Sequence, residues 1–153
     1  MFTAENTVLI RRPVSEVFAY VTDPTKIAEW RTNVLEIIGY EPPLHLGSTY
    51  EIAEREMGRH QFGQHVTAYE PDRLIVTETT SGAVRPLQRY SFESTADGGT
   101  RYTARLDITT HGVMRLFEPL MRGRVRKRMV TYGENLKRNL ESPGEAAVAQ
   151  PAS

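Results

Sequence analysis

The sequence predicts an α+β fold in which a curved antiparallel sheet of seven strands surrounds a long C-terminal helix, with two short helices between strands 1 and 2. The first observation behind this prediction is a hydrophobic period of two from Gly47 to His111, with turn residues at intervals of roughly ten. The second is a change to helical spacing after Gly112. The length of 153 residues fits one domain that can bury a core without disulfides.

The N-terminal part predicts a strand, two short helices and a second strand. Pro13 stops the first strand and opens a helix, because proline suits the first helical turn. Asp23 and Pro24 end that helix and can start the next, since aspartate caps free backbone N–H groups. The expected elements are a strand over 2–11, a helix over 13–22, a helix over 24–33 and a strand over 34–40.

The middle of the chain predicts an antiparallel meander. Its turns contain Gly, Pro, Asp and Ser, which accept the backbone dihedrals of hairpins. The expected strands cover 48–57, 60–70, 74–80, 85–94 and 100–110.

The C-terminal part predicts one long amphipathic helix and a tail. A single apolar stripe at steps of three or four residues runs for more than six turns. Its members are Phe117, Met121, Val125, Met129, Tyr132, Leu136 and Leu140. Small residues and prolines follow, so we expect one domain over 1–141 and a disordered tail over 142–153.

Several segments together resemble a known family. These are Ile10 to Phe18, Val21 to Pro24 with Trp30 shortly after, Gly47, Tyr69 to Leu74, and Gly98 to Arg101. The chain resembles the superfamily of polyketide cyclases and dehydrases, START lipid-transfer domains and Bet v 1 allergens (SRPBCC), in its bacterial polyketide-cyclase-like branch. The resemblance implies a helix-grip fold with an internal cavity for a small hydrophobic ligand. It implies no shared catalytic signature.

Composition narrows the classes of function. The chain has no cysteine, which excludes thiol catalysis, cysteine zinc sites and disulfides and favours a reducing compartment. The N-terminus lacks the features of a signal peptide, and no apolar stretch reaches the roughly 18 residues of a membrane span. We therefore expect a soluble, cytoplasmic protein without stable membrane insertion.

Charge is zero overall but unevenly placed. Eight basic residues lie between Arg115 and Arg138, against only Glu118 and Glu134. This basic helix could bind nucleic acid or an anionic membrane. The apolar stripe runs straight through the basic run, so the solvated face of an ordinary helix is the alternative, and no nucleic-acid partner is expected.

Three candidate ligand contacts are apolar. Trp30, the only tryptophan, ends the second short helix, where the resemblance implies the rim of the cavity. Phe117 and Met121 lie on the inward stripe of the long helix. For all three residues, packing in the core is the alternative.

The other candidates lie on strands: Tyr50, Phe62, His65 and Tyr90. A two-residue turn at Gly58-Arg59 would pair Ile52 with His65 and put Tyr50, Glu54 and His65 on one face, with Glu54 diagonal to His65. These residues would form an acid/base pair or a solvent-facing polar cluster. Phe62 would lie on the opposite, core face. Tyr90 shares a face with Gln88 and Phe92 and could orient a ligand carbonyl; packing with one satisfied hydrogen bond is the alternative.

The same strand pattern argues against a metal site. His60 and His65 are five residues apart on one expected strand, so they point to opposite faces and cannot share a metal ion. We expect no cofactor.

Three functions remain open from the sequence. The favoured one is a carrier or binding protein for a small hydrophobic molecule such as a lipid or polyketide, as a monomer or homodimer. The alternative is a cofactor-independent cyclase or dehydratase that uses Tyr, His or Arg side chains of the pocket. Binding of nucleic acid or membrane through the basic helix is the third.

Overall fold

The expected α+β class is confirmed in the computed structural model, which describes residues 1–56, 58–82 and 84–142. The end of the expected third strand at Met57 and the expected tail from residue 143 lie outside these residues. In chain order the elements are β1 (Phe2–Ile10), α1 (Val14–Thr22), η1 (Pro24–Lys26), α2 (Ile27–Trp30), β2 (Val34–Ile38), β3 (Thr49–Arg55), β4 (Arg59–Glu70), β5 (Leu74–Thr79), β6 (Leu87–Ser94), β7 (Thr100–Ile108), η2 (Gly112–Phe117) and α3 (Glu118–Glu141).

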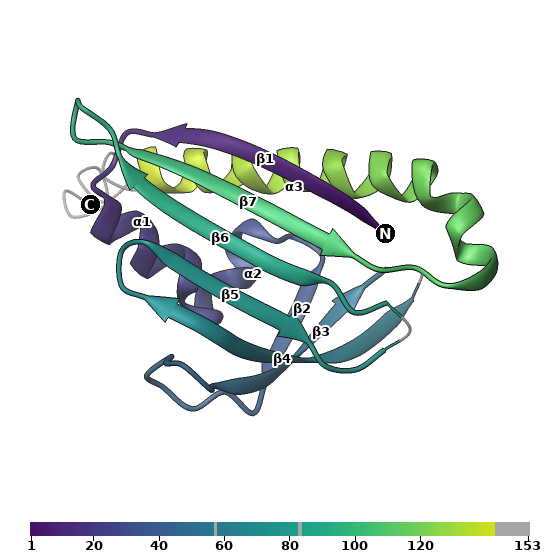
Figure 1. The fold of residues 1–153 in the computed structure, drawn as a ribbon. Coiled ribbons are helices and arrows are strands. Elements are labelled where there is room, and N and C mark those ends of the chain that lie inside the picture. Colours follow the sequence, from purple (N-terminus) through teal and green to yellow (C-terminus); the bar gives the residue numbers. More distant parts are fainter. Residues whose placement is uncertain (57, 83, 143–153) are drawn as a thin grey trace, which may run out of the picture.

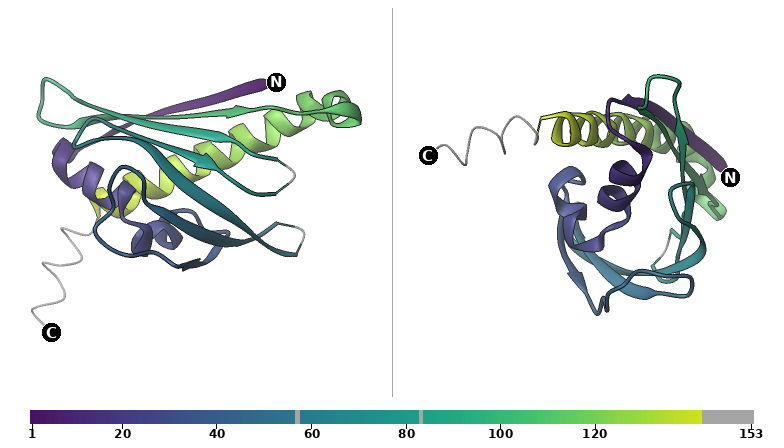
Figure 2. Two further views of the ribbon diagram at one scale, coloured as in Figure 1. Left: turned by 60° about the horizontal axis from the view of Figure 1, so that its bottom comes forward. Right: turned by 90° about the vertical axis from the view of Figure 1, so that its left-hand side faces the viewer.

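The strands form one antiparallel sheet in the order β1-β7-β6-β5-β4-β3-β2. Consecutive strands β1 and β2 therefore lie at opposite edges, and the helices α1 and α2 connect them (Figure 1). The pairing register shifts between Val34 and Glu36 and between Val66 and Ala68, and such bulges bend a sheet. In the right-hand view of Figure 2 the sheet curves into an open half-barrel, and α3 lies across its top.

The short helices close one end of this half-barrel (Figure 1). In α1 the buried side chains are Val17, Phe18 and Val21, which recur at helical spacing and join the main hydrophobic core. Asp23 caps η1, because its carboxylate accepts a hydrogen bond from the backbone N–H of Thr25 at 2.9 Å. The chain then makes one turn of α2 and enters β2 at Val34.

The long helix α3 packs closely on β1 because of a single glycine. A Cβ atom at Gly133 would lie 2.6 Å from Cγ2 of Val8 and 2.8 Å from Nδ2 of Asn6. The Asn6 amide donates to the backbone carbonyl of Met129, which lies one turn earlier on α3. The missing side chain of Gly133 thus lets the helix lie against the edge strand.

The start of α3 differs from the sequence prediction. The apolar stripe predicts an inward-facing Phe117, but this residue ends the 3-10 helix η2 and its side chain is 52% exposed. Every residue from His111 to Phe117 is exposed. From Met121 onward the stripe faces inward as predicted, with Met129, Leu136 and Leu140 buried.

No helix within residues 1–56, 58–82 and 84–142 is long and apolar enough to cross a bilayer.

Candidate functional site

A cavity of about 540 Å³ lies between the concave face of the sheet and α3. This volume is within the range of small-molecule sites. Its inner end is lined by Trp30 and Arg31 from the end of α2, by β6 and β7, and by Met129 and Gly133. Its outer end is lined by the β3–β4 hairpin, the β5–β6 loop and the first turns of α3, where exposed residues such as His60 and Ser81 form the mouth.

The inner wall is aromatic. The ring of Trp30 packs edge-to-face on Tyr90 at 6.4 Å and on Tyr132 at 6.1 Å, and Tyr90 lies 6.0 Å from Tyr102. Trp30 is only 2% exposed, so it lies in the wall of the cavity and not at its rim, where the family resemblance had placed it. Aromatic rings give this end a large apolar contact area with a few hydroxyl groups.

A buried charged cluster lies beside the aromatic wall. The guanidinium of Arg31 is 3.4 Å from Oε2 of Glu54, and both residues are 8% exposed. The other oxygen of Glu54, Oε1, is 3.2 Å from Nε2 of His60. Arg31 also stacks over the ring of Tyr132 at 5.9 Å. The Glu54 carboxylate therefore bridges a buried cation and an imidazole, all three on the cavity wall.

This cluster corrects the predicted register of the β3–β4 hairpin. The sequence predicts a two-residue turn that pairs Ile52 with His65, but the strands pair Ile52 with Phe62 and Glu54 with His60. The offset of three residues puts the apolar side chains of Ile52 and Phe62 opposite each other. It also turns the predicted outer face of β3 toward the inside of the sheet. Glu54 and Tyr50 thus point inward with Phe62, and the predicted Glu54–His65 pair does not form.

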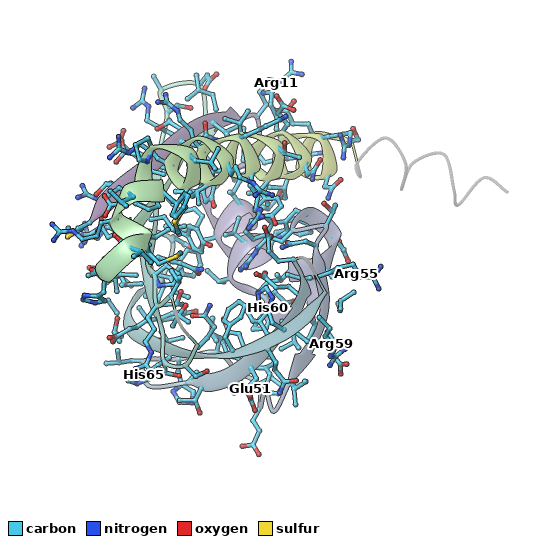
Figure 3. The ribbon with its side chains drawn as sticks, turned by 90° about the vertical axis from the view of Figure 1, so that its right-hand side faces the viewer. Arg11, Glu51, Arg55, Arg59, His60 and His65 are labelled. Carbon is cyan, nitrogen blue, oxygen red and sulfur yellow. The ribbon has the colours of Figure 1, made fainter. Side chains whose placement is uncertain are left out.

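The two histidines of β4 do lie on opposite faces, as their spacing predicts. His60 points into the curve of the sheet, whereas His65 and Glu51 lie on its outer side (Figure 3). Among the described residues, no three His, Asp or Glu side chains come close enough to hold a metal ion.

The mouth carries a second ion pair. The Arg128 guanidinium on α3 donates to the Glu56 carboxylate at the end of β3, across the opening of the cavity. Arg124, one turn earlier on α3, is exposed and also lines the mouth. The entrance is therefore basic on the side of the helix.

Some buried polar atoms in the cavity wall have no protein partner. Within the described part of the chain, neither the Trp30 indole N–H nor the Thr79 hydroxyl makes a hydrogen bond. The neighbouring Gln64, paired in the sheet with both Tyr50 and Thr79, has an unpartnered side-chain amide. Buried polar groups are normally satisfied, so the indole N–H and this hydroxyl are exceptions within the wall of the cavity.

Burial keeps the inner tyrosines protonated. It raises the pKa of Tyr50 and of Tyr132 to about 12, and it raises the pKa of Tyr90 and, more strongly, of Tyr102. At neutral pH these hydroxyls are therefore neutral hydrogen-bonding groups. The Tyr90 hydroxyl donates to Oε1 of Gln88 at 3.3 Å, and that oxygen also accepts from Thr77.

These pKa values predict alkaline unfolding. A folded-state pKa above the unfolded value of about 10 contributes stability that is complete below that pH and is lost as the pH rises. Each such tyrosine should remove about 1.4 kcal/mol per pH unit above pH 10 until its raised pKa is reached. Thermal unfolding followed by circular dichroism from pH 8 to pH 11, with a parallel tyrosinate absorbance titration, checks this. Titration of all the tyrosines together near pH 10 would contradict it.

The residues predicted from the sequence as ligand contacts fall into two groups. Trp30, Phe62, Tyr90 and Met121 line the cavity. Three others do not belong to its lining. Tyr50 is buried in a neighbouring cluster with Ile27, Val34 and Ile52; His65 lies on the outer face of β4; and Phe117 is exposed on η2.

Sequence reasoning missed Arg31 and His60. Arg31 follows α2, whose single turn is too short to show a periodic pattern, so its burial had no signal. The inward orientation of His60 did have a signal in the sequence. His60 lies two residues before Phe62 on the same strand, so both side chains point to the same face. Had Ile52 been paired with Phe62, the contact between Glu54 and His60 would have followed.

Comparison with known proteins gives the family. The model of the family described as polyketide cyclase / dehydrase and lipid transport matches residues 1–141. No curated protein sequence matches the chain.

Solved structures share the fold at low sequence identity. The Zhui aromatase/cyclase from Streptomyces sp. R1128 superposes with a TM-score of 0.79 at 12% identity, covering 95% of this chain and 97% of that one. The di-domain ARO/CYC StfQ of the steffimycin biosynthetic pathway gives 0.74 at 14% identity, covering 94% of this chain and 51% of that one. Ara h 8.0201 gives 0.70 at 16% identity over 92% and 98% of the two chains.

Such identities establish the fold alone, whereas the family model spans nearly the whole sequence. The helix-grip architecture predicted from the sequence is thus found again in aromatase/cyclases and in a Bet v 1-like protein. The chain belongs to the polyketide cyclase/dehydrase and lipid transport family.

Proposed function

We propose that the protein binds a small, mostly apolar molecule that carries an oxygen function, with the oxygen directed at Arg31. The observation that carries this proposal is a cavity of about 540 Å³ whose largely apolar and aromatic wall contains one buried guanidinium. Sites for small molecules commonly combine an apolar wall with a few polar groups that fix orientation. The apolar body would lie against Trp30, Tyr90 and Met121.

Arg31 suits an oxygen ligand because its guanidinium has more N–H donors than its contact with Glu54 takes up. A guanidinium has five N–H donors, and Glu54 takes one contact at 3.4 Å. A carbonyl, enolate or carboxylate oxygen would add a charge-assisted hydrogen bond in a site of low dielectric.

The contact between Glu54 and His60 supports a second candidate function, catalysis of proton transfer. If Nε2–H of His60 donates to Glu54, the lone pair of Nδ1 is free to accept a proton. A base beside a carbonyl oxygen that is held by Arg31 could remove the proton from the adjacent carbon, while Arg31 stabilises the enolate. That step begins ring closure and dehydration of poly-carbonyl chains.

Native mass spectrometry of freshly purified protein tests the binding proposal. We expect a mass above that of the chain, which is lost on denaturation, and a compound that contains oxygen in the organic extract. Protein that carries no ligand and takes up no apolar carbonyl compound would contradict the proposal.

The chemical fate of the bound compound separates the carrier from the enzyme. A carrier returns the compound unchanged after incubation, whereas an enzyme yields a ring-closed or dehydrated product. If the protein is an enzyme, Glu54→Gln and His60→Gln should lower the rate by about 100-fold or more with little change in binding. Equal loss in Glu51→Gln, on the outer face of β3, would contradict roles for Glu54 and His60.

A further inference from the structure

The end of the molecule that carries the cavity mouth also exposes an apolar surface. Val113, Leu116 and Phe117 of η2 and Leu120 of α3 form it, and we call these four residues the apolar cap. Leu116 is 80% exposed, Val113 72% and Leu120 63%. This segment projects beyond the end of β7, at the right of the molecule in Figure 1. Large exposed apolar side chains that cluster in this way mark a surface for interaction.

Cations lie within and after the apolar cap along the chain. Arg115, Arg122, Arg124, Arg126 and Lys127 are all exposed, and we call them the basic collar. The acidic residue within this segment, Glu118, is bound by the N-terminal ammonium group at 2.9 Å and by the Thr110 hydroxyl. Its charge is therefore already compensated, and no carboxylate of the described residues forms an ion pair with a collar side chain.

Two residues of the collar, Arg124 and Lys127, share the exposed face of Leu120 on α3. Arg122 and Arg126 lie about half a turn away around the helix, and Arg122 stacks over the ring of Phe2 at 5.8 Å. Leu120, Arg124 and Lys127 recur at helical spacing and are exposed, whereas Met121, Val125 and Met129 on the other face line the cavity. An exposed apolar strip edged by arginine and lysine is the pattern of helices that lie in the interface of a membrane. The mouth of the cavity opens beside it.

We propose that the apolar cap and basic collar dock the protein reversibly on an anionic membrane surface, with the cavity mouth facing the lipid. The cap would enter the boundary between headgroups and acyl chains while the collar contacts anionic headgroups. An apolar ligand could then pass between bilayer and cavity without crossing water. This proposal does not depend on the identity of the cavity ligand.

Other occupants fit the surface less well. A second copy packed on the same patch would bring two basic collars together. Nucleic acid would use the collar but would leave the apolar cap in water. Only an anionic membrane, with charged headgroups above an apolar interior, matches both the basic collar and the apolar cap.

The test is co-sedimentation with vesicles of phosphatidylcholine alone or of equimolar phosphatidylcholine and phosphatidylglycerol. The wild type should bind only the mixed vesicles, and more weakly as sodium chloride is added. The pair Leu116→Ser and Leu120→Ser should weaken binding about tenfold or more. The pair Arg115→Gln and Lys127→Gln should weaken it roughly fivefold for each charge removed.

Matched controls lie at the other end of the molecule. Leu9→Ser with Leu46→Ser removes two leucines of comparable exposure, and Arg73→Gln with Arg101→Gln removes two exposed charges. Both control pairs should bind like the wild type. Dye uptake into the cavity of Leu116→Ser/Leu120→Ser should also be unchanged, which shows that the variant is folded and keeps docking separate from ligand binding.

Four results would overturn the proposal. These are no binding to mixed vesicles at low salt, equal loss in a control pair, a dimer that Leu116→Ser disrupts, and binding to nucleic acid that depends on the collar alone.

Discussion

Replacing Arg31 with methionine should destabilise the protein by about 3 kcal/mol at neutral pH. The substitution keeps an apolar stem of similar length but leaves the carboxylate of Glu54 buried without its cation. Breaking a buried ion pair typically costs 3–5 kcal/mol, and we expect the lower end because His60 still contacts Glu54. The measurement is urea unfolding followed by circular dichroism.

The same experiment can be made specific to the charge. Adding Glu54→Gln to Arg31→Met should recover most of the lost stability, because no unpaired charge then stays buried. Arg59→Met is the matched control: its pair with Glu36 is shorter, at 2.9 Å, but both side chains are about half exposed. That variant should lose less than about 1 kcal/mol. A similar loss in both would show that burial is not the cause.

Filling the cavity from β7 should abolish ligand uptake while the fold persists. Ala104 is buried and lines the cavity midway along β7, opposite Tyr90 in the sheet. In Ala104→Phe the added ring occupies the space that a ligand would take, so binding of an anionic apolar dye such as anilinonaphthalene sulfonate should fall by more than about tenfold. Fluorescence titration measures this fall.

The free energy of unfolding of Ala104→Phe should rise slightly or stay unchanged. A ring placed in empty space replaces missing contacts, whereas a ring forced into a packed core costs about 1–3 kcal/mol. Thr103→Phe is the control, because the adjacent residue lies on the opposite face of the same strand. Dye binding that survives in Ala104→Phe would place the dye outside the cavity. Equal loss in both variants would point to a general defect.

The parts of the fold that repeat along the chain were predictable from the sequence. The stripe from Met121 to Leu140 and the alternation along β6 each repeat often enough to decide which face is buried. Features set by one residue or one turn were not. The register of β3 on β4 depends on a short turn, and a shift of three residues moves Glu54 from the outer face to the cavity.

Site residues divide in the same way. Tyr90 and Met121 could be named because each lies on an element with a recognisable apolar face, and Trp30 because the family resemblance implied its place beside the cavity. Arg31 lies just beyond a helix of one turn, and only its tertiary contacts bury it. Phe117 continues the apolar spacing of α3, but it belongs to the preceding 3-10 helix η2, and its side chain turns to solvent.

The placement of β1 and β2 at opposite edges of the sheet has a consequence for biosynthesis. β1 pairs along its whole length with β7, from Phe2 opposite Ile108 to Ile10 opposite Thr100. The first strand to leave the ribosome must therefore wait for the seventh, and loops of this size are entropically slow to close. Since α3 packs on β1 and follows β7 in the chain, the walls of the cavity meet only when nearly all of the described chain is made. The pocket can acquire its first ligand only after translation has passed α3.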